Sequence, residues 1–363
     1  MPITVEQDKI ILSPTYDISQ SYEANYQNGP SIAAFPPPRK IKRKFPFIGF
    51  TVNSLLGIPA GPLLNAKWIS AYAQLGFDLP VYKTVRTIAA PSHPAPNCLF
   101  LDVKGQLGES DFIRQLTAAT NPPVSLDEIS ITNSFGMPSR DVKTWQDDIA
   151  VAKSALSAGQ ILIVSVVGTP GQRDLSDDYA MCARFAAEAG ADVVEINLSC
   201  PNVVSGEGSV YSDPDVSSHI TKTVKQAIGH TPLIIKIGYI AHHACFKKVI
   251  EANAPYVSAI SGINTLSFEV ISRLGGSALP GRLKSGVCGS AIRQCAMAQA
   301  ARIVELKKEG RYDFSIIGVG GIMTVDHIRQ FFDLGVDAVM SATGAMWNPQ
   351  LAYQYWKEML VSS

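Results

Sequence analysis

Eight short apolar segments alternate with helical segments from about residue 56 to the end of the chain, and this alternation constrains the fold most. The apolar segments are nearly continuous rather than alternating, which is typical of parallel strands buried on both faces. The helical segments cover 178–190, 290–310 and 326–335, and several end at a glycine, a common helix stop. The candidate strands are 55–60, 80–85, 161–167, 192–198, 233–238, 257–264, 314–320 and 337–343.

This order predicts an α/β protein with a (β/α)₈ TIM barrel over residues 51–363, preceded by an N-terminal extension, residues 1–50. A doubly wound open sheet is the alternative. No G-x-G-x-x-G follows the first strand and no phosphate-binding G-x-x-x-x-G-K-[ST] occurs, so no nucleotide motif favours that alternative. The connections 86–160 and 265–290 are long, and we expect them to be functional insertions at the C-terminal face of the barrel.

Charge and cysteine content exclude several classes of protein. The chain has 31 Lys and Arg against 31 Asp and Glu, so its formal net charge of zero predicts no general attraction to nucleic acid. The N-terminus lacks a signal-peptide pattern, and no apolar run reaches the ~20 residues of a membrane span. The six cysteines form no C-x-x-C and none pairs near His242-His243, so we expect no metal site. A cytoplasmic protein with reduced thiols and no integral membrane segment is predicted.

The extension contains the basic, proline-rich stretch "FPPPRKIKRKFPF", residues 35–47. One interpretation is a segment that packs over the surface of the barrel. The other is a contact with a partner or a membrane surface, although the stretch lacks the apolar helical stripe of membrane-surface helices.

Polar residues at the carboxyl ends of the predicted strands are the candidates for function, because barrel active sites lie there. The second strand carries Lys83 and the fifth carries Lys236. A lysine inside a barrel mouth is costly unless it is paired, so each is expected to face an anionic or electron-rich ligand. A Schiff base and a solvated lysine at the rim are the alternatives.

Glycines cluster at the ends of the last two strands, in "GVGG" (318–321) and "SATG" (341–344). Bare main-chain N–H groups at these two ends predict a phosphate site, which recurs at this place in barrels. The segment "SGVCGSAIR" (285–293) enters a helix and is expected to add donors. The alternative is that the glycines only allow tight turns.

Four asparagines and one cysteine lie near strand ends or in the first long connection: Asn133, Asn197, Cys200, Asn202 and Asn264. Carboxamides offer donors and acceptors together and favour a flat ligand rich in N–H and C=O groups. Ordinary turn asparagines are the alternative. Cys200 is the only cysteine on a loop predicted at the catalytic face, where a thiol acts as nucleophile or base. A buried, inert thiol is the alternative.

These motifs resemble the dihydroorotate dehydrogenase family over roughly residues 55–350: "NLSCPN" (197–202), "NSFGMP" (133–138), "INT" (263–265) and "GVGGI…SATG". The resemblance implies an FMN-binding barrel that oxidises dihydroorotate to orotate in pyrimidine biosynthesis. Related dihydropyrimidine dehydrogenases share the Asn-Leu-Ser-Cys-Pro motif.

The resemblance also implies a role for each matching residue. Cys200 would be the base that removes the C5 proton while hydride leaves C6 for flavin N5, as in the soluble class 1 enzymes; the membrane-associated class has serine. The implied substrate-binding residues are Lys83, Asn133, Phe135, Gly136, Met137, Asn197, Asn202, Asn264 and Thr265. The implied flavin-binding residues are Ala60, Gly61, Lys83, Asn197, Lys236, Gly289, Gly320, Gly321, Gly344 and Ala345.

The electron acceptor stays open between fumarate, a quinone, and NAD reached through a partner subunit. Ser139 stands where many class 1 members have asparagine, and 87–100 resembles the proline-rich connection of the membrane-associated class. We expect a homodimer. The alternatives for function are an FMN oxidoreductase acting on another dihydropyrimidine, a phosphate-binding lyase or isomerase that uses a Schiff-base lysine, and a non-catalytic binding barrel.

Overall fold

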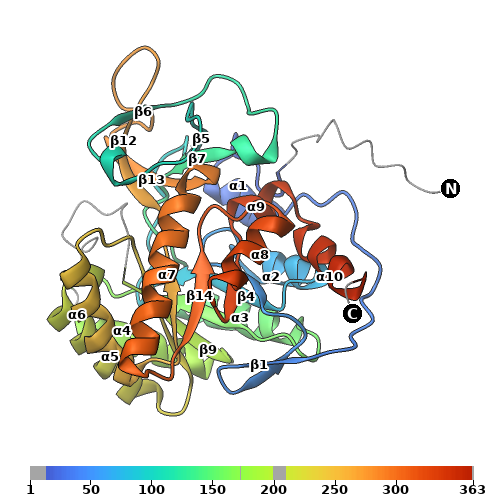
Figure 1. Cartoon of the computed structure of the whole chain (residues 1–363), viewed down its shortest axis with the longest axis vertical. Coiled ribbons are helices and arrows are strands. Elements are labelled where there is room, and N and C mark those ends of the chain that lie inside the picture. Colours follow the sequence, from blue (N-terminus) through green and yellow to red (C-terminus); the bar gives the residue numbers. More distant parts are fainter. Residues whose placement is uncertain (1–13, 172, 199–209, 362–363) are drawn as a thin grey trace.

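The structure is a computed structural model that describes residues 14–171, 173–198 and 210–361, and its centre is a closed barrel of eight parallel strands (Figure 1). Every strand predicted for the barrel is present, and the (β/α)₈ prediction is confirmed. In barrel order the strands are β3 (Leu56–Ile58), β4 (Leu79–Val85), β8 (Ile163–Val166), β9 (Val193–Asn197), β10 (Leu233–Ile237), β11 (Ala259–Gly262), β14 (Ser315–Val319) and β15 (Ala338–Met340).

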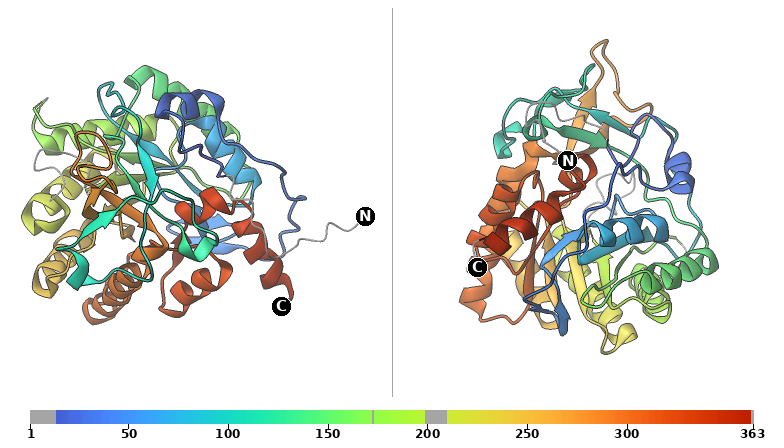
Figure 2. Two further views of the ribbon diagram at one scale, coloured as in Figure 1. Left: turned by 90° about the horizontal axis from the view of Figure 1, so that it is seen from above. Right: turned by 90° about the vertical axis from the view of Figure 1, so that its right-hand side faces the viewer.

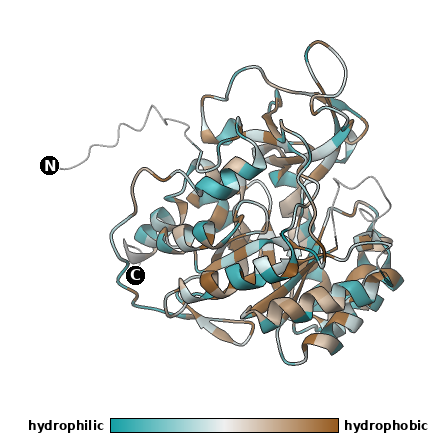
Figure 3. Ribbon diagram, turned by 180° about the vertical axis from the view of Figure 1, so that it is seen from behind, coloured by the Kyte–Doolittle hydropathy of each residue, from teal (hydrophilic) through white to brown (hydrophobic). Residues whose placement is uncertain are grey.

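Helices surround the barrel as a ring (Figure 2, left). Their amphipathic character places hydrophobic segments toward the strands and hydrophilic segments outside (Figure 3). Asn65, Asp141, Asp174, Asp213 and Thr324 precede five of these helices and accept hydrogen bonds from first-turn N–H groups. The helices are α2 (Ala66–Gln74), α3 (Val142–Ser154), α4 (Leu175–Glu188), α5 (Pro214–Ile228), α6 (His243–Asn253), α7 (Arg293–Gly310), α8 (Val325–Asp333), α9 (Thr343–Trp347) and α10 (Leu351–Val361).

A hairpin closes the barrel at the amino ends of its strands. It consists of β1 (Phe45–Phe47) and β2 (Phe50–Val52), and Figure 1 shows it at the lower end of the molecule. Phe47 and Val52 are buried in one apolar cluster with residues from the barrel strands, including Leu79 and Ile163. The boundary predicted at residue 50 therefore falls inside an element that plugs the barrel.

The described part of the N-terminal extension packs along the barrel. It contains the helix α1 (Tyr22–Asn28) and then runs to the hairpin without regular structure. The Thr15 hydroxyl lies 2.6 Å from the Tyr72 hydroxyl of α2, and the Trp68 indole N–H donates to the Asn25 carbonyl at 3.3 Å. These contacts hold the extension against α2 and near the carboxyl ends of the strands.

The two long connections form a second sheet, the cap sheet, above the barrel (Figure 1). In β12 buried positions alternate with more exposed ones, as expected for a sheet with one face toward the protein. The cap strands pair mainly with strands far away in the sequence, so no local pattern announces the sheet. In sheet order they are β5 (Cys98–Phe100), β7 (Ser130–Asn133), β13 (Lys284–Gly289), β12 (Leu266–Ile271) and β6 (Gln115–Thr117).

Among the residues that the structure describes, none of the helices has the length and apolar character needed to cross a lipid bilayer.

Candidate active site

A cavity of ≈ 1320 Å³, including its open mouth, lies between the carboxyl ends of the barrel strands and the cap sheet. The predicted site residues that line it are Ala60, Gly61, Lys83, Asn133, Phe135, Met137, Asn197, Lys236, Asn264, Thr265, Gly289, Gly320, Gly321 and Gly344.

Four predicted site residues are not among those that line the cavity. Cys200 and Asn202 lie outside the described residues, directly after the strand β9. Gly136 has φ 77°, and a Cβ there would come within 2.6 Å of the His93 ring, so this backbone position requires glycine. Ala345 is buried, and its carbonyl accepts a hydrogen bond from the Tyr72 hydroxyl at 3.2 Å.

Both lysines are buried in the cavity wall, with exposed fractions of 8% for Lys83 and 5% for Lys236. The alternative of solvated lysines at the rim is therefore wrong. Burial lowers the pKa of Lys236, and the carboxylate of Glu195 acts in the opposite direction. The cavity wall thus carries two buried amino groups, and that of Lys236 lies beside the Glu195 carboxylate.

Three carboxamides line the cavity, and two of them are hydrogen-bonded to each other. The Asn264 Nδ2 donates to Asn197 Oδ1 at 3.2 Å, and the Thr265 N–H donates to Asn264 Oδ1 at 2.9 Å. Asn133 lies on the cap strand β7, and its Nδ2 donates to the Cys288 Sγ at 3.4 Å. Such contacts fix which amide edge faces the cavity and pre-organise the site for a ligand with paired donors and acceptors.

Two cysteines, Cys98 and Cys288, also line the cavity. The prediction that Cys200 is the only cysteine at this face is therefore wrong. Burial is the main cause that raises the pKa of both thiols, so they are neutral near pH 7. They come from the cap strands β5 and β13, which belong to the two connections predicted at this face; the sheet that these connections form was not predicted.

The N-terminal extension supplies part of the cavity wall through Tyr16 and Tyr22. Both rings pack edge-on against Phe135, with centroids 5.9 Å and 6.1 Å away. Burial raises the pKa of both phenols, which are therefore neutral. No sequence pattern in the extension pointed to this contact.

Glu195 is a further cavity residue that the sequence analysis missed. It is fully buried, and neither carboxylate oxygen makes a hydrogen bond to any residue that the structure describes. Burial raises its pKa, whereas Lys236 and the Ser165 hydroxyl lower it. An acidic residue within the otherwise apolar strand "DVVEINL" was a visible signal of the same kind as Lys236.

The glycines of the predicted phosphate site are explained partly by packing. A Cβ at Gly344 would lie 2.1 Å from the Ile322 carbonyl oxygen, so glycine is required there even without a ligand. Gly61 differs, because no atom lies within 4 Å of the position its Cβ would take, although it lines the cavity. The backbone of Gly61 has φ 146°, a conformation that favours glycine whatever the space around it.

Within residues 14–171, 173–198 and 210–361, no group of three or more His, Cys, Asp or Glu side chains is placed to hold a metal ion.

The fold and this cavity define a barrel enzyme whose active site lies at the carboxyl ends of its strands, beneath a cap sheet. Residues 117–360 match the family model described as dihydroorotate dehydrogenase. The chain is also 39% identical over 359 residues to the dihydroorotate dehydrogenase of Dictyostelium discoideum, covering 95% of this chain and 97% of that protein. The chain therefore belongs to the dihydroorotate dehydrogenase family, and the predicted family and oxidoreductase class are confirmed.

Other relatives agree with this assignment. The dihydroorotate dehydrogenase B (NAD(+)) catalytic subunit of Desulforudis audaxviator is 28% identical over 295 residues, covering 80% of this chain and 90% of that subunit. A crystal structure of DHODH in complex with ferulenol from Eimeria tenella shares the fold, with a TM-score of 0.70 and 16% identity. That match covers 89% of this chain and 86% of the other.

Proposed function

We propose that this protein oxidises (S)-dihydroorotate to orotate in pyrimidine biosynthesis, with FMN bound in the cavity. The observation that carries the proposal is the grouping of Lys83, Lys236 and three carboxamides in one buried cavity beneath the cap sheet. A pyrimidine ring with a carboxylate offers matching N–H and C=O edges and one negative charge.

The cavity wall fits a flavin mononucleotide. Gly61 leaves open space beside the backbone of the first strand, and Ala60 adjoins it. Gly289, Gly320, Gly321, Gly344 and Ala345 belong to the region assigned to the phosphate. Lys236, with Asn197 near it, provides a buried cation for the pyrimidine side of the flavin ring. FMN, when bound, supplies the hydride acceptor, and the protein orients it.

The substrate ring is held by Asn133, Asn197 and Asn264 together with Asn202 and Thr265. Lys83 and the main chain of residues 135–137 receive the substrate carboxylate. This division follows from charge, because carboxamides are neutral and read paired ring edges, whereas a carboxylate favours a cation and N–H donors.

Cys200 acts as the general base that removes the C5 proton. It lies outside the described residues, and the support for this role is its sequence position three residues after Asn197. A thiol with an ordinary pKa of ~8.5 needs only a modest downward shift to act as a base near neutral pH.

We also propose a cytoplasmic homodimer that passes electrons to fumarate, to a quinone, or to NAD through a partner subunit. The apolar side chains of Ile113, Val124 and Leu274, in the two long connections, are at least 84% exposed, which supports an interface at the cap. Sedimentation analysis tests the dimer, and a monomer at micromolar concentration would contradict it.

One experiment tests the activity and the acceptor together. The purified protein is expected to be yellow, and anaerobic dihydroorotate should bleach the flavin absorbance. Reoxidation by fumarate, by a soluble quinone and by NAD is then followed separately. Protein that cannot be loaded with flavin would overturn the proposal.

Other results of this experiment would favour other functions, one of which would use a buried lysine. A colourless protein that traps a carbonyl substrate on borohydride addition would favour a Schiff-base lyase or isomerase. Bound flavin that dihydroorotate fails to reduce would favour another dihydropyrimidine as substrate.

A further inference from the structure

Five polar side chains form one layer inside the barrel and come from five different strands: Thr84, Ser165, Glu195, Lys236 and Ser261. Thr84, Glu195 and Lys236 line the cavity. None is more than 8% exposed, and Glu195 and Ser165 have no exposed surface. Barrel interiors are normally filled by branched apolar side chains, so this polar layer requires an explanation.

The strand register places these side chains next to one another. Ser165 of β8 is directly opposite Glu195 of β9, and Ser261 of β11 is directly opposite Lys236 of β10. Ile234, two residues before Lys236, pairs with Glu195, so Lys236 and Glu195 are diagonal neighbours on one face. Their side chains interact electrostatically.

Glu195 itself lines the cavity, and two hydroxyl groups lie near it. Thr84 lines the cavity, and its Oγ1 lies 3.0 Å from the Ser165 Oγ, within hydrogen-bonding distance. The Ser165 hydroxyl in turn faces Glu195 across the β8–β9 pair. Because Glu195 lines the cavity, its carboxylate can take up a proton at the cavity itself.

The energetics of Glu195 make it sensitive to any charge in the cavity. A buried carboxylate without hydrogen bonds is costly, and the nearby cation only partly offsets that cost. Of the other described ionisable groups that line the cavity, Cys98, Cys288, Tyr16 and Tyr22 are neutral near pH 7. Lys83 and Lys236 are the lining cations among the described residues.

We propose that Glu195 is a redox-linked proton site: it is ionised beside Lys236 while the bound flavin is oxidised and takes up one proton when the flavin is reduced. The proposal rests on the function proposed above. Hydride transfer brings two electrons and one proton, so the flavin gains one negative charge. One proton from solvent, taken up by Glu195 at the cavity, then keeps the charge of the barrel interior constant. Glu195 acts through the cation beside it and is a positioning residue.

The test is the pH dependence of the reduction potential of the bound flavin, measured from about pH 7 to 9. With uptake of two protons per two electrons, the equilibrium constant of reduction changes about 100-fold per pH unit. The reduction potential then falls by about 59 mV per pH unit. With one proton the equilibrium constant changes tenfold and the potential falls by about 30 mV. The wild-type protein is expected to follow the two-proton slope and Glu195→Gln the one-proton slope.

Ser261→Ala is the matched control, because it removes a buried polar group of the same layer that binds no proton. Its slope should remain that of the wild type. A one-proton slope in the wild type, or equal slopes for the wild type and Glu195→Gln, would overturn the proposal. If Glu195→Gln fails to hold flavin, the number of protons that the wild-type protein takes up on photoreduction is measured in weak buffer. Two protons per flavin are expected, and one proton per flavin would overturn the proposal.

Failure of the proposed function is distinguishable from failure of this inference. Protein that binds no flavin contradicts the function, whereas flavin that takes up one proton per reduction contradicts only the role of Glu195.

Discussion

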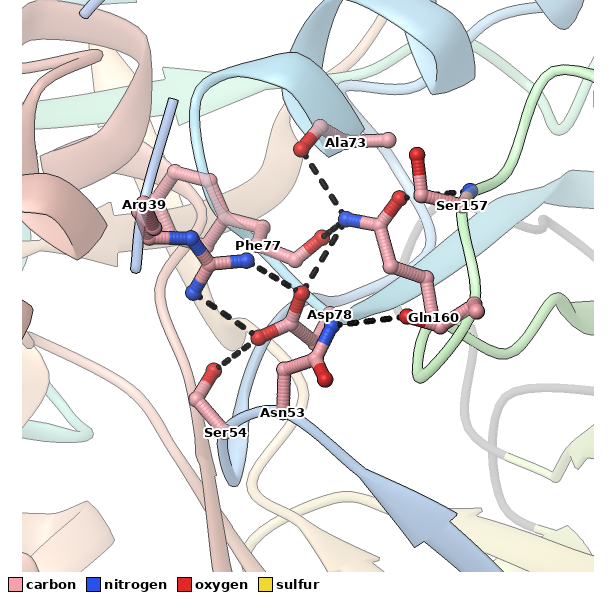
Figure 4. Close-up of polar contacts among 9 residues, drawn as sticks. Arg39, Asn53, Ser54, Ala73, Phe77, Asp78, Ser157 and Gln160 are labelled. Carbon is pink, nitrogen blue, oxygen red and sulfur yellow. Dashed lines mark hydrogen bonds and ion pairs between the residues drawn. The ribbon is translucent and has the colours of Figure 1, made fainter. Parts of the chain in front are cut away.

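Arg39 and Asp78 form a buried ion pair that fastens the N-terminal extension to the barrel (Figure 4). The Arg39 guanidinium donates to both carboxylate oxygens, at 2.6 and 3.0 Å, and the Asp78 side chain has no exposed surface. Ser54 and Gln160 also donate to this carboxylate, at 2.6 and 3.0 Å. The basic, proline-rich stretch is thus joined to the barrel at Arg39 by a bidentate contact.

We expect Arg39→Met to lower the free energy of unfolding by about 3 kcal/mol, because it leaves a buried carboxylate without its cation. Urea denaturation of the flavin-loaded protein measures the change. The control is Lys143→Met, which removes a cation from the exposed pair Lys143–Asp147 and should change stability by less than about 1 kcal/mol. If Arg39→Met and Asp78→Asn were additive in the double variant, the pair would not be coupled.

We expect stability to fall as the pH drops below about 6.5, in part because of His327. Its Nδ1 accepts hydrogen bonds from the Met323 N–H at 3.2 Å and from Arg293 at 3.3 Å. Burial and then Arg293 lower its pKa, with Asp127 and Asp326 opposing. The unfolded chain therefore binds more protons than the folded protein. The contribution of His327 to stability is complete above its pKa in the unfolded chain, and it is lost as the pH falls toward its lower pKa in the folded protein.

His327→Asn tests this contribution, because its Oδ1 can replace Nδ1 as acceptor and does not titrate. Urea denaturation at about pH 7.5 and 5.5 should show a smaller loss for the variant than for the wild type. Equal losses would assign the pH dependence to other groups, including His93, whose pKa burial also lowers.

We expect Asn264→Ala to weaken orotate binding about 10- to 100-fold while the flavin is retained. The variant removes both a carboxamide of the cavity and the hydrogen bond that orients Asn197. Titration of the flavin spectrum with orotate measures the change. The control is Asn53→Ala, an exposed carboxamide that binds the Ala158 carbonyl away from the cavity, and it should leave affinity unchanged. Wild-type affinity in Asn264→Ala would remove this residue from the site.

We expect Cys200→Ala to lose most reduction of the flavin by dihydroorotate while keeping FMN bound. Cys200→Ser should retain some activity with a higher pH optimum, because a hydroxyl gives up its proton less readily than a thiol. Rapid-mixing absorbance over a range of pH measures both. Wild-type rates in the alanine variant, or an unchanged profile in the serine variant, would contradict the role of base.

The barrel could be predicted from the sequence because its information is local. Each strand, such as 161–167 or 233–238, is an apolar run that must be buried on both faces, and each is followed by helical periodicity. Lys236 could be placed in the active site because a charge inside such a run needs a partner. Glu195 met the same criterion and was missed.

The cap sheet could not be predicted, because its strands are short and pair mainly across long sequence separations. The pairing of β7 with β13 places Gly286 opposite Asn133, and it brings Cys288 beside the Asn133 carboxamide. A three- or six-residue strand has no periodicity strong enough to specify a partner more than a hundred residues away.

The sequence by itself determined the eight-stranded barrel, the end at which its site lies, and the residue types gathered there, since strand burial and strand ends are local properties. Only the tertiary structure decided that Tyr16 and Tyr22 form a wall of the cavity, that the cap strands cover its mouth, and that Glu195 lies buried beside Lys236. These relationships depend on packing between distant segments, in which burial and charge act through space rather than along the chain.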